Sequence, residues 1–105
     1  MVEKMIRTTS RTTFSANLGS RRVDVSGFKV TIPGFEDFSF VVHRPVIDVD
    51  GTQAKELWQV SELSSGQIVS GHQESTRQQA IDNAAKLLNH VGRTALESAI
   101  ESALR

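Results

Sequence analysis

Residues 57–88 read LWQVSELSSGQIVSGHQESTRQQAIDNAAKLL, and this stretch decides the fold of the C-terminal half. Its first residues alternate apolar and polar side chains, as a half-buried strand does. The Ser-Ser-Gly sequence at 64–66 predicts a tight turn, because glycine supports the positive φ that such turns need. Ile68 and Val69 then begin a returning strand, and an amphipathic helix follows. The stretch therefore predicts a hairpin and a helix.

Two helices are expected at the C-terminus. The first begins at Ser75 or Thr76, because a hydroxyl followed three residues later by glutamine has capping-box spacing. Gly92 is the expected stop, and Thr94 with Glu97 repeats the capping signal for a second helix. A helix this short is marginal in water, so it needs a surface to lie against. Apolar residues recur at three- and four-residue steps in both helices: Ala80, Ile81, Ala84, Leu87, Leu88 and Val91, then Ala95, Leu96, Ala99, Ile100, Ala103 and Leu104.

The N-terminal half predicts strands. Val23 and Val25 alternate with polar residues, and the alternation resumes on a shifted register at Phe28. We interpret the intervening Ser26-Gly27 as a β-bulge or a tight turn. Residues 28–32 and 38–43 predict an antiparallel hairpin around Pro33-Gly34.

Two further segments are less regular. Residues 46–49 predict a short strand closed by the Asp50-Gly51 turn. Residues 1–20, rich in Thr, Ser and Arg, suit either an edge strand or a flexible basic arm.

The order of these elements predicts one α+β domain over residues 1–105. We expect an antiparallel sheet of four to five strands with two C-terminal helices packed on one face. The other face of the sheet is then expected to be polar or to meet a partner.

Composition excludes several kinds of protein. The chain has no cysteine, which rules out disulfides and thiolate chemistry and suits a cytoplasmic location. No apolar run approaches the ~20 residues that span a bilayer, so no membrane association is expected. The N-terminus also lacks the apolar region of a signal peptide.

The net charge of zero hides an asymmetry. Residues 1–30 hold six basic and two acidic side chains, whereas residues 31–76 hold two basic and seven acidic ones. Such a division indicates either a basic segment that faces an acidic surface or a charged partner, or an ordinary scatter of charges on a solvated surface. The candidate contacts to a partner or to nucleic acid are therefore Lys4, Arg7, Arg11, Arg21 and Arg22.

Catalytic and metal-binding patterns are missing from the sequence. No histidine has metal-ligand spacing to another histidine or a carboxylate, and an enzyme using His43 or His72 has no spacing argument. Residues 48–51 resemble the start of a calcium loop, but Gln59 stands where its final acid is needed. We therefore expect no catalytic residue, no cofactor and no metal site, and a protein that is not an enzyme.

Two families show partial likeness to the C-terminal half. Thr76–Ala80 with Ala84, Ala85 and Leu88 resembles the last helix of double-stranded-RNA-binding domains, although Gln78 and Ile81 replace that family's basic residues. Residues 60–88 are similar to the antitoxin of the HicA/HicB pairs, although Ser61-Glu62 replaces its Pro-Asp. We interpret both as the result of strand–turn–strand–helix packing rather than kinship, and assign neither family.

Two function classes follow. The first is a non-catalytic protein–protein interaction module: a small inhibitor, an antitoxin-like protein or an accessory protein of a phage or mobile element, which binds another protein or itself as a homodimer. The alternative is a nucleic-acid-binding protein that uses the basic N-terminal segment. Trp58, the only tryptophan, is expected to be core or half-buried, and is the candidate interface residue if exposed.

Overall fold

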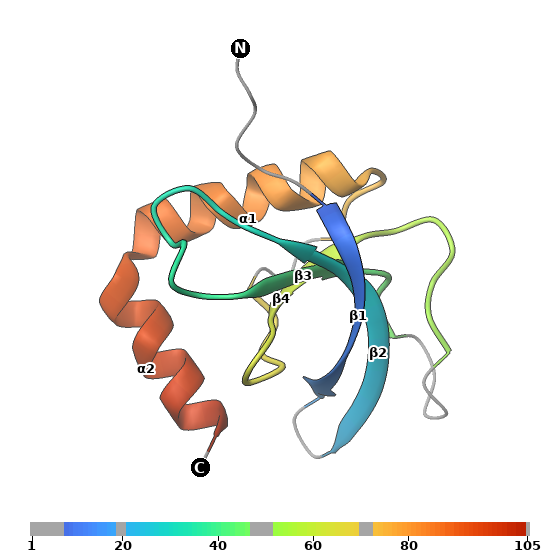
Figure 1. Ribbon diagram of the computed structural model, residues 1–105, viewed down its shortest axis with the longest axis horizontal. Helices are drawn as coiled ribbons and strands as arrows, with labels where there is room; N and C mark the ends of the chain where they lie inside the picture. The colour runs from blue at the N-terminus through green and yellow to red at the C-terminus, as the bar shows by residue number, and fades with distance from the viewer. Residues whose placement is uncertain (1–7, 19–20, 47–51, 70–72, 105) are drawn as a thin grey trace.

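The computed structural model describes residues 8–18, 21–46, 52–69 and 73–104. It shows the expected α+β fold. Within these residues the strands are β1 (Thr8–Asn17), β2 (Arg22–Val30), β3 (Phe40–His43) and β4 (Gln59–Glu62), followed by the helices α1 (Arg77–Val91) and α2 (Arg93–Ala103). The sheet is antiparallel in the order β1-β2-β3-β4, and both helices pack on one of its faces (Figure 1). The part of the expected N-terminal segment that is described is thus an edge strand.

The strand pairing confirms the hairpin between β2 and β3, in which Val30 lies opposite Phe40. β3 also pairs antiparallel with β4, and there Val42 lies opposite Val60. The predicted return of the second hairpin is shorter than expected, because Ser61 and Ile68 form only an isolated bridge there. The expected strand at 46–49 is described only at Val46, which bridges to Gln53, and its turn lies outside the described residues.

The sheet carries a hydrophobic core on each face. The helix-covered face holds the larger one, built from Val30, Ile32, Phe40, Val42 and Val60 together with apolar residues of α1 and Leu96 of α2. The opposite face holds a smaller one of Phe14, Ala16, Val25 and Val41. Our expectation that this second face is polar or meets a partner is therefore wrong, because the sheet covers it by its own curvature (Figure 1).

The curl of the sheet brings β1 against the turn after β4. The amide of Asn17 donates to the carbonyl of Gly66 at 2.9 Å. Gly66 has a φ of 73°, and a Cβ placed on it would lie 1.9 Å from the carbonyl oxygen of Ser15. Only glycine fits this contact, so the predicted glycine of the turn also closes the sheet.

β2 passes from one core to the other at Gly27 without a bulge, which corrects our interpretation of Ser26-Gly27. Its pairing with β1 is regular from Arg11 onward, with Gly27 opposite Thr12, and the register shift of this pair of strands lies between Thr8 and Arg11 instead. Val25 belongs to the smaller core and Val30 to the larger one, so the apolar residues change faces within a continuous strand. A Cβ at Gly27 would lie 2.5 Å from Cγ1 of Val41, which shows how closely β2 and β3 approach there.

α1 begins and ends where the sequence predicts. Thr76 is its N-cap, and its Oγ1 accepts a hydrogen bond from the amide of Gln79 at 3.1 Å. Gly92 ends the helix with a φ of 88°. The expected capping box of Thr94 and Glu97 is wrong: α2 starts one residue after Gly92, so Thr94 already lies in its first turn and no side chain caps it.

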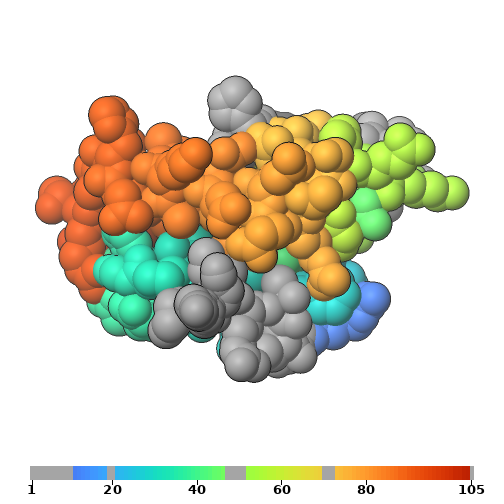
Figure 2. Space-filling view, turned by 90° about the horizontal axis from the view of Figure 1, so that it is seen from above, coloured from blue at the N-terminus to red at the C-terminus, as the bar shows by residue number. Residues whose placement is uncertain are grey.

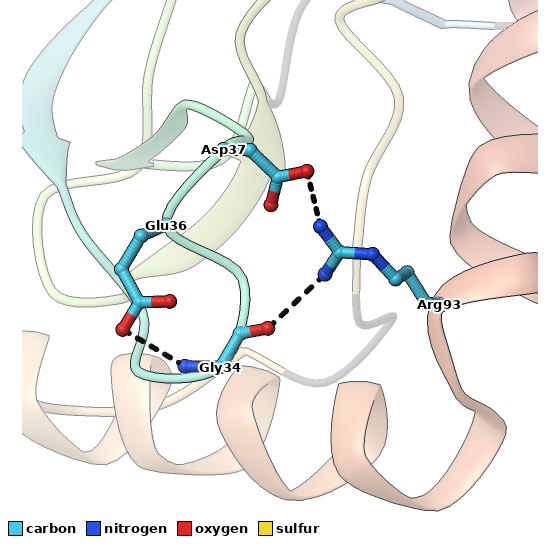
Figure 3. A network of polar contacts seen from close by, with 4 residues as sticks. All are labelled: Gly34, Glu36, Asp37 and Arg93. Atoms are coloured by element: carbon cyan, nitrogen blue, oxygen red, sulfur yellow. Dashed lines mark hydrogen bonds and ion pairs between the residues drawn. The ribbon is translucent and has the colours of Figure 1, made fainter.

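The side chain of Arg93, at the start of α2, bonds to the loop between β2 and β3 (Figure 3). Its guanidinium donates to the carbonyl of Gly34 at 3.1 Å and pairs with the carboxylate of Asp37. This hydrogen bond lowers the pKa of the Asp37 carboxyl below its usual value. The guanidinium also lies 5.0 Å from the ring centroid of Phe38. The short second helix thus has the surface that its length requires.

Candidate functional site: an Arg–aromatic groove

A hollow of about 570 Å³ lies on the helix-bearing face of the sheet, at the end where α1 begins. Four parts of the chain meet there: β1, the middle of β2, Arg44 with residues 53–58, and the first turn of α1. Figure 2 shows the start of α1, residues 52–58 and β1 gathered at one end of the molecule. We call this hollow the Arg–aromatic groove and define it by Arg11, Phe28, Arg44, Lys55, Trp58 and Arg77.

Strand pairing explains why these residues meet. Arg11 lies opposite Phe28 across β1 and β2, and Phe28 lies opposite Val42 on β3. Since Val42 faces Val60, Arg44 and Trp58 follow on the same face, two residues beyond this pair. The groove therefore continues the larger core beyond the N-terminus of α1.

Two half-buried rings, Phe28 and Trp58, form the apolar part of the groove. Their centroids are 6.5 Å apart and their planes are inclined at 48°. The Cζ of Arg44 lies 3.9 Å from the Trp58 centroid, and that of Arg11 lies 5.0 Å from the Phe28 centroid. Arg77 lies near both rings, at 4.9 Å from Phe28 and 5.5 Å from Trp58. All of these distances are within the range of cation–π attraction.

The groove is positively charged. Three guanidinium groups and the ammonium of Lys55 line it, and no carboxylate is among its described lining residues. α1 adds to this potential, because the positive end of its dipole lies at Arg77 and its first turn holds no acidic residue.

Hydrogen bonds hold residues 52–58 in place. Arg44 donates to the carbonyl of Lys55, and Gln53 donates to the carbonyls of Arg44 and Ser26 at 2.9 and 3.3 Å. The backbone of Trp58 pairs with Glu74 in both directions, at 2.7 and 2.9 Å. The indole is therefore fixed from the main chain, while its ring lines the groove.

The candidate residues that the sequence singled out lie in different parts of the structure. Arg11 and Trp58 line the groove. Arg21 and Arg22 lie at the opposite end of the β1–β2 hairpin, roughly 20 Å of strand away. Arg22 is engaged there, donating to the carbonyls of Ser15 and Ala103 at 3.1 Å each. Lys4 and Arg7 lie outside the described residues.

Sequence reasoning missed Phe28, Arg44, Lys55 and Arg77 as site residues. Phe28 was considered only as part of the predicted hairpin at 28–43, and the three basic residues are far apart in the chain. Arg44 could have been found once the register of β3 and β4 was known. With Phe40 paired to Glu62, Arg44 comes opposite Trp58. Arg77 needed knowledge of where α1 crosses the sheet, which no local pattern supplies.

The histidines do not converge on a site within the described part of the chain. His43 is buried under the second face, where its Nε2 lies 2.7 Å from Oγ of Ser61 and burial lowers the pKa of its imidazole. His90 is exposed on α1, and His72 and the segment 48–51 lie outside the described residues. No cluster of three metal-ligating side chains occurs among the residues that the structure places.

Comparison with known proteins gave no match: no family model, no curated protein and no solved structure is similar to this chain. Among residues 8–18, 21–46, 52–69 and 73–104, no helix has the length and apolar character to cross a bilayer. The function is therefore argued from the geometry of the groove.

Proposed function

We propose that this protein binds nucleic acid through the Arg–aromatic groove, without catalysing a reaction. The observation that carries the proposal is the meeting of four cationic side chains from separate segments around two aromatic rings, with no acidic residue among the described lining. Cations that neutralise backbone phosphates supply most of the affinity in protein–nucleic acid complexes, and aromatic rings accept bases.

The cationic groups of the groove come from four separate places in the fold. Arg11 stands on β1, Arg44 follows β3, Lys55 lies beyond it, and Arg77 begins α1. A guanidinium donates two parallel hydrogen bonds to a phosphate, which a single ammonium cannot do. This version of the nucleic-acid hypothesis replaces the N-terminal basic segment by a site that only the folded chain assembles.

The lining of the groove also favours binding over catalysis. Neither an imidazole nor a carboxylate, the side chains used most often for general acid–base chemistry, is among its described residues. A nucleic-acid-binding role agrees with the cytoplasmic location expected from the cysteine-free sequence, and fractionation of the host cell tests that location.

Salt dependence tests the proposal directly. A labelled 12-mer oligonucleotide is titrated with the protein at ~50 mM and ~200 mM salt, and its anisotropy is measured. If all four cations contact phosphates of a single strand, log K falls with log salt with a slope of about −2.8. Failure of the 12-mer and of its duplex to bind at ~50 mM salt would contradict the proposal.

A pair of double variants assigns the binding to the groove. Arg11→Gln with Lys55→Gln removes two exposed groove charges, and the slope should become shallower by about 1.4. Lys29→Gln with Lys86→Gln removes two exposed charges outside the groove and should leave the slope unchanged. Equal losses in both double variants would mean that the groove is not the site.

The interaction module remains the second candidate, on a different observation. An apolar hollow of about 200 Å³ lies between α1, α2 and residues 67–69, and it is lined by Ile68, Leu87, Val91 and Ala99 among others. Val91, the last residue of α1, is 44% exposed, and Leu104, the C-cap of α2, is 56% exposed. Exposed apolar groups of this kind are typical of protein contacts when they are contiguous.

Sedimentation and affinity capture test this second candidate. Self-association at high micromolar concentration that is abolished by Val91→Glu would support a homodimer. A strictly monomeric protein that captures no protein from host lysate would contradict the interaction module.

A further inference from the structure

We infer that the groove is built for single-stranded nucleic acid, with one base stacked on the indole of Trp58. This inference rests on the proposed function and deepens it, because it names the strand state and the stacking residue. It starts from the faces of the two rings. A core tryptophan is covered by aliphatic neighbours, whereas Trp58 turns a face to the groove and is covered there by the guanidinium of Arg44.

The geometry of Arg44 shows what the indole face accepts. Its Cζ lies 3.9 Å from the ring centroid, a separation at which flat groups stack. A nucleobase is also flat and has a π-face of its own, so it takes the same place on the ring. Among the described residues, the guanidinium of Arg44 also donates an exposed hydrogen bond to the carbonyl of Lys55. A phosphate that replaces the Lys55 carbonyl as acceptor gives Arg44 a stronger, charge-assisted hydrogen bond.

The size and shape of the groove favour a single strand. Its volume of about 570 Å³ lies in the range of pockets that enclose a small organic molecule, which is the scale of one or two nucleotides. Bases within a duplex are stacked on each other and present only their edges, so they offer no free face to an indole. A single strand offers both its phosphates and its unstacked bases.

Phe28 provides a second platform beside the first. Its centroid lies 6.5 Å from that of Trp58, and Arg11 and Arg77 approach it at 5.0 and 4.9 Å. Because the two rings are inclined at 48°, a base stacked on Trp58 is not enclosed between two parallel rings. It meets Phe28, or a base stacked on Phe28, at an angle. An open platform of this kind tolerates any base, and we expect weak sequence preference.

The decisive experiment uses the wild-type protein with three probes of equal length: a single-stranded 12-mer, the same backbone with abasic sites, and the duplex. Because Trp58 is the only tryptophan, its fluorescence reports on this ring alone. We expect the single strand to change the fluorescence and to bind more tightly than the abasic strand, by a factor between about 5 and about 150. The duplex should bind more weakly than the single strand and leave the fluorescence unchanged.

Variants of the ring separate stacking from folding. Trp58→Leu should weaken binding of the single strand by a factor in the same range and leave the affinity of the abasic strand unchanged, whereas Trp58→Phe, which retains a ring, should restore most of the affinity. Arg44→Gln should reduce the salt dependence while the fluorescence change at saturation persists. Binding of the labelled strand is followed by anisotropy in each variant.

The outcomes distinguish the two proposals. Equal affinity for the normal and abasic strands, or equal affinity for the duplex, overturns base stacking and leaves nucleic-acid binding in place. Absence of binding to all three probes overturns both. Competition by polyglutamate as effective as that by the single strand shows a general polyanion site and overturns the choice of nucleic acid.

Discussion

His43 and Ser61 form a buried hydrogen bond across β3 and β4, with 2.7 Å between Nε2 and Oγ. The other ring nitrogen, Nδ1, lies 3.0 Å from the carbonyl of Arg44. A carbonyl only accepts, so Nδ1 carries the proton and Nε2 accepts from the serine hydroxyl. The neutral imidazole thus makes one hydrogen bond with each ring nitrogen, to the carbonyl of the groove residue Arg44 and to the hydroxyl of Ser61.

This arrangement makes stability depend on pH. Burial lowers the pKa of His43 below the 6.5 of an exposed imidazole, so the unfolded chain binds the proton first as the pH falls. Stability is therefore unaffected by His43 well above pH 6.5 and decreases as the pH falls through 6.5 toward the lowered value. Between pH 7.5 and 5.5 the loss is at most about 1.4 kcal/mol.

Urea unfolding at these two pH values measures the effect. His43→Gln should lack this part of the loss, whereas the matched change at the exposed His90, His90→Gln, should keep it. An identical pH dependence in wild type and His43→Gln would show that His43 titrates normally.

The contact between Gly66 and Ser15 predicts an asymmetry between two glycines of positive φ. Gly66→Ala places a Cβ 1.9 Å from the Ser15 carbonyl, whereas the same change at Gly34 meets no atom within 4 Å. Both changes incur the left-handed strain of about 1–2 kcal/mol, and only Gly66→Ala adds a steric clash of about 1–3 kcal/mol. Equal losses in chemical denaturation would mean that β1 does not close against the turn.

The carboxylate of Glu62 organises that same turn from a position that is 3% exposed. It accepts hydrogen bonds from the amides of Ser64 and Ser65 at 3.1 and 2.8 Å, and from both serine hydroxyls. Glu62→Gln replaces one carboxylate oxygen by an NH2 group, which cannot accept hydrogen bonds from the serine amides and hydroxyls. We therefore expect a loss of about 2–4 kcal/mol in the free energy of unfolding. The exposed control Glu56→Gln should cost less than about 0.5 kcal/mol.

Arg22 is expected to act on α2 rather than on nucleic acid. Its guanidinium holds the carbonyl of Ala103, one of the last carbonyls of α2, which the helix itself leaves unpaired. Arg22→Gln should speed hydrogen exchange over residues 100–104 and change oligonucleotide affinity less than twofold. A tenfold loss of affinity would return Arg22 to the binding surface.

Much of the fold was readable from local pattern. The ends of α1 at Thr76 and Gly92 were predicted because capping and left-handed φ are local requirements. The β2–β3 hairpin was predicted because alternation and a Pro-Gly turn leave few registers. The prediction of a bulge at Gly27 was wrong. In the sequence, a strand whose apolar residues change from one face to the other has the same pattern as a strand with an inserted residue.

The candidate site was only partly predictable. Arg11 and Trp58 were singled out by residue type, but Arg21 and Arg22 were grouped with Arg11 because they are close in the chain. Strand pairing sends them to the far end of the hairpin, since an antiparallel turn separates residues that the sequence places together.

The sequence by itself determined the order of strands and helices and both ends of α1, because helix periodicity, strand alternation and turn chemistry act over a few residues. Only the tertiary structure decided that the sheet curls until Gly66 meets Ser15, and that Arg11, Arg44, Lys55 and Arg77 converge on Phe28 and Trp58. Both depend on register and curvature, which arise from packing between segments that are distant along the chain.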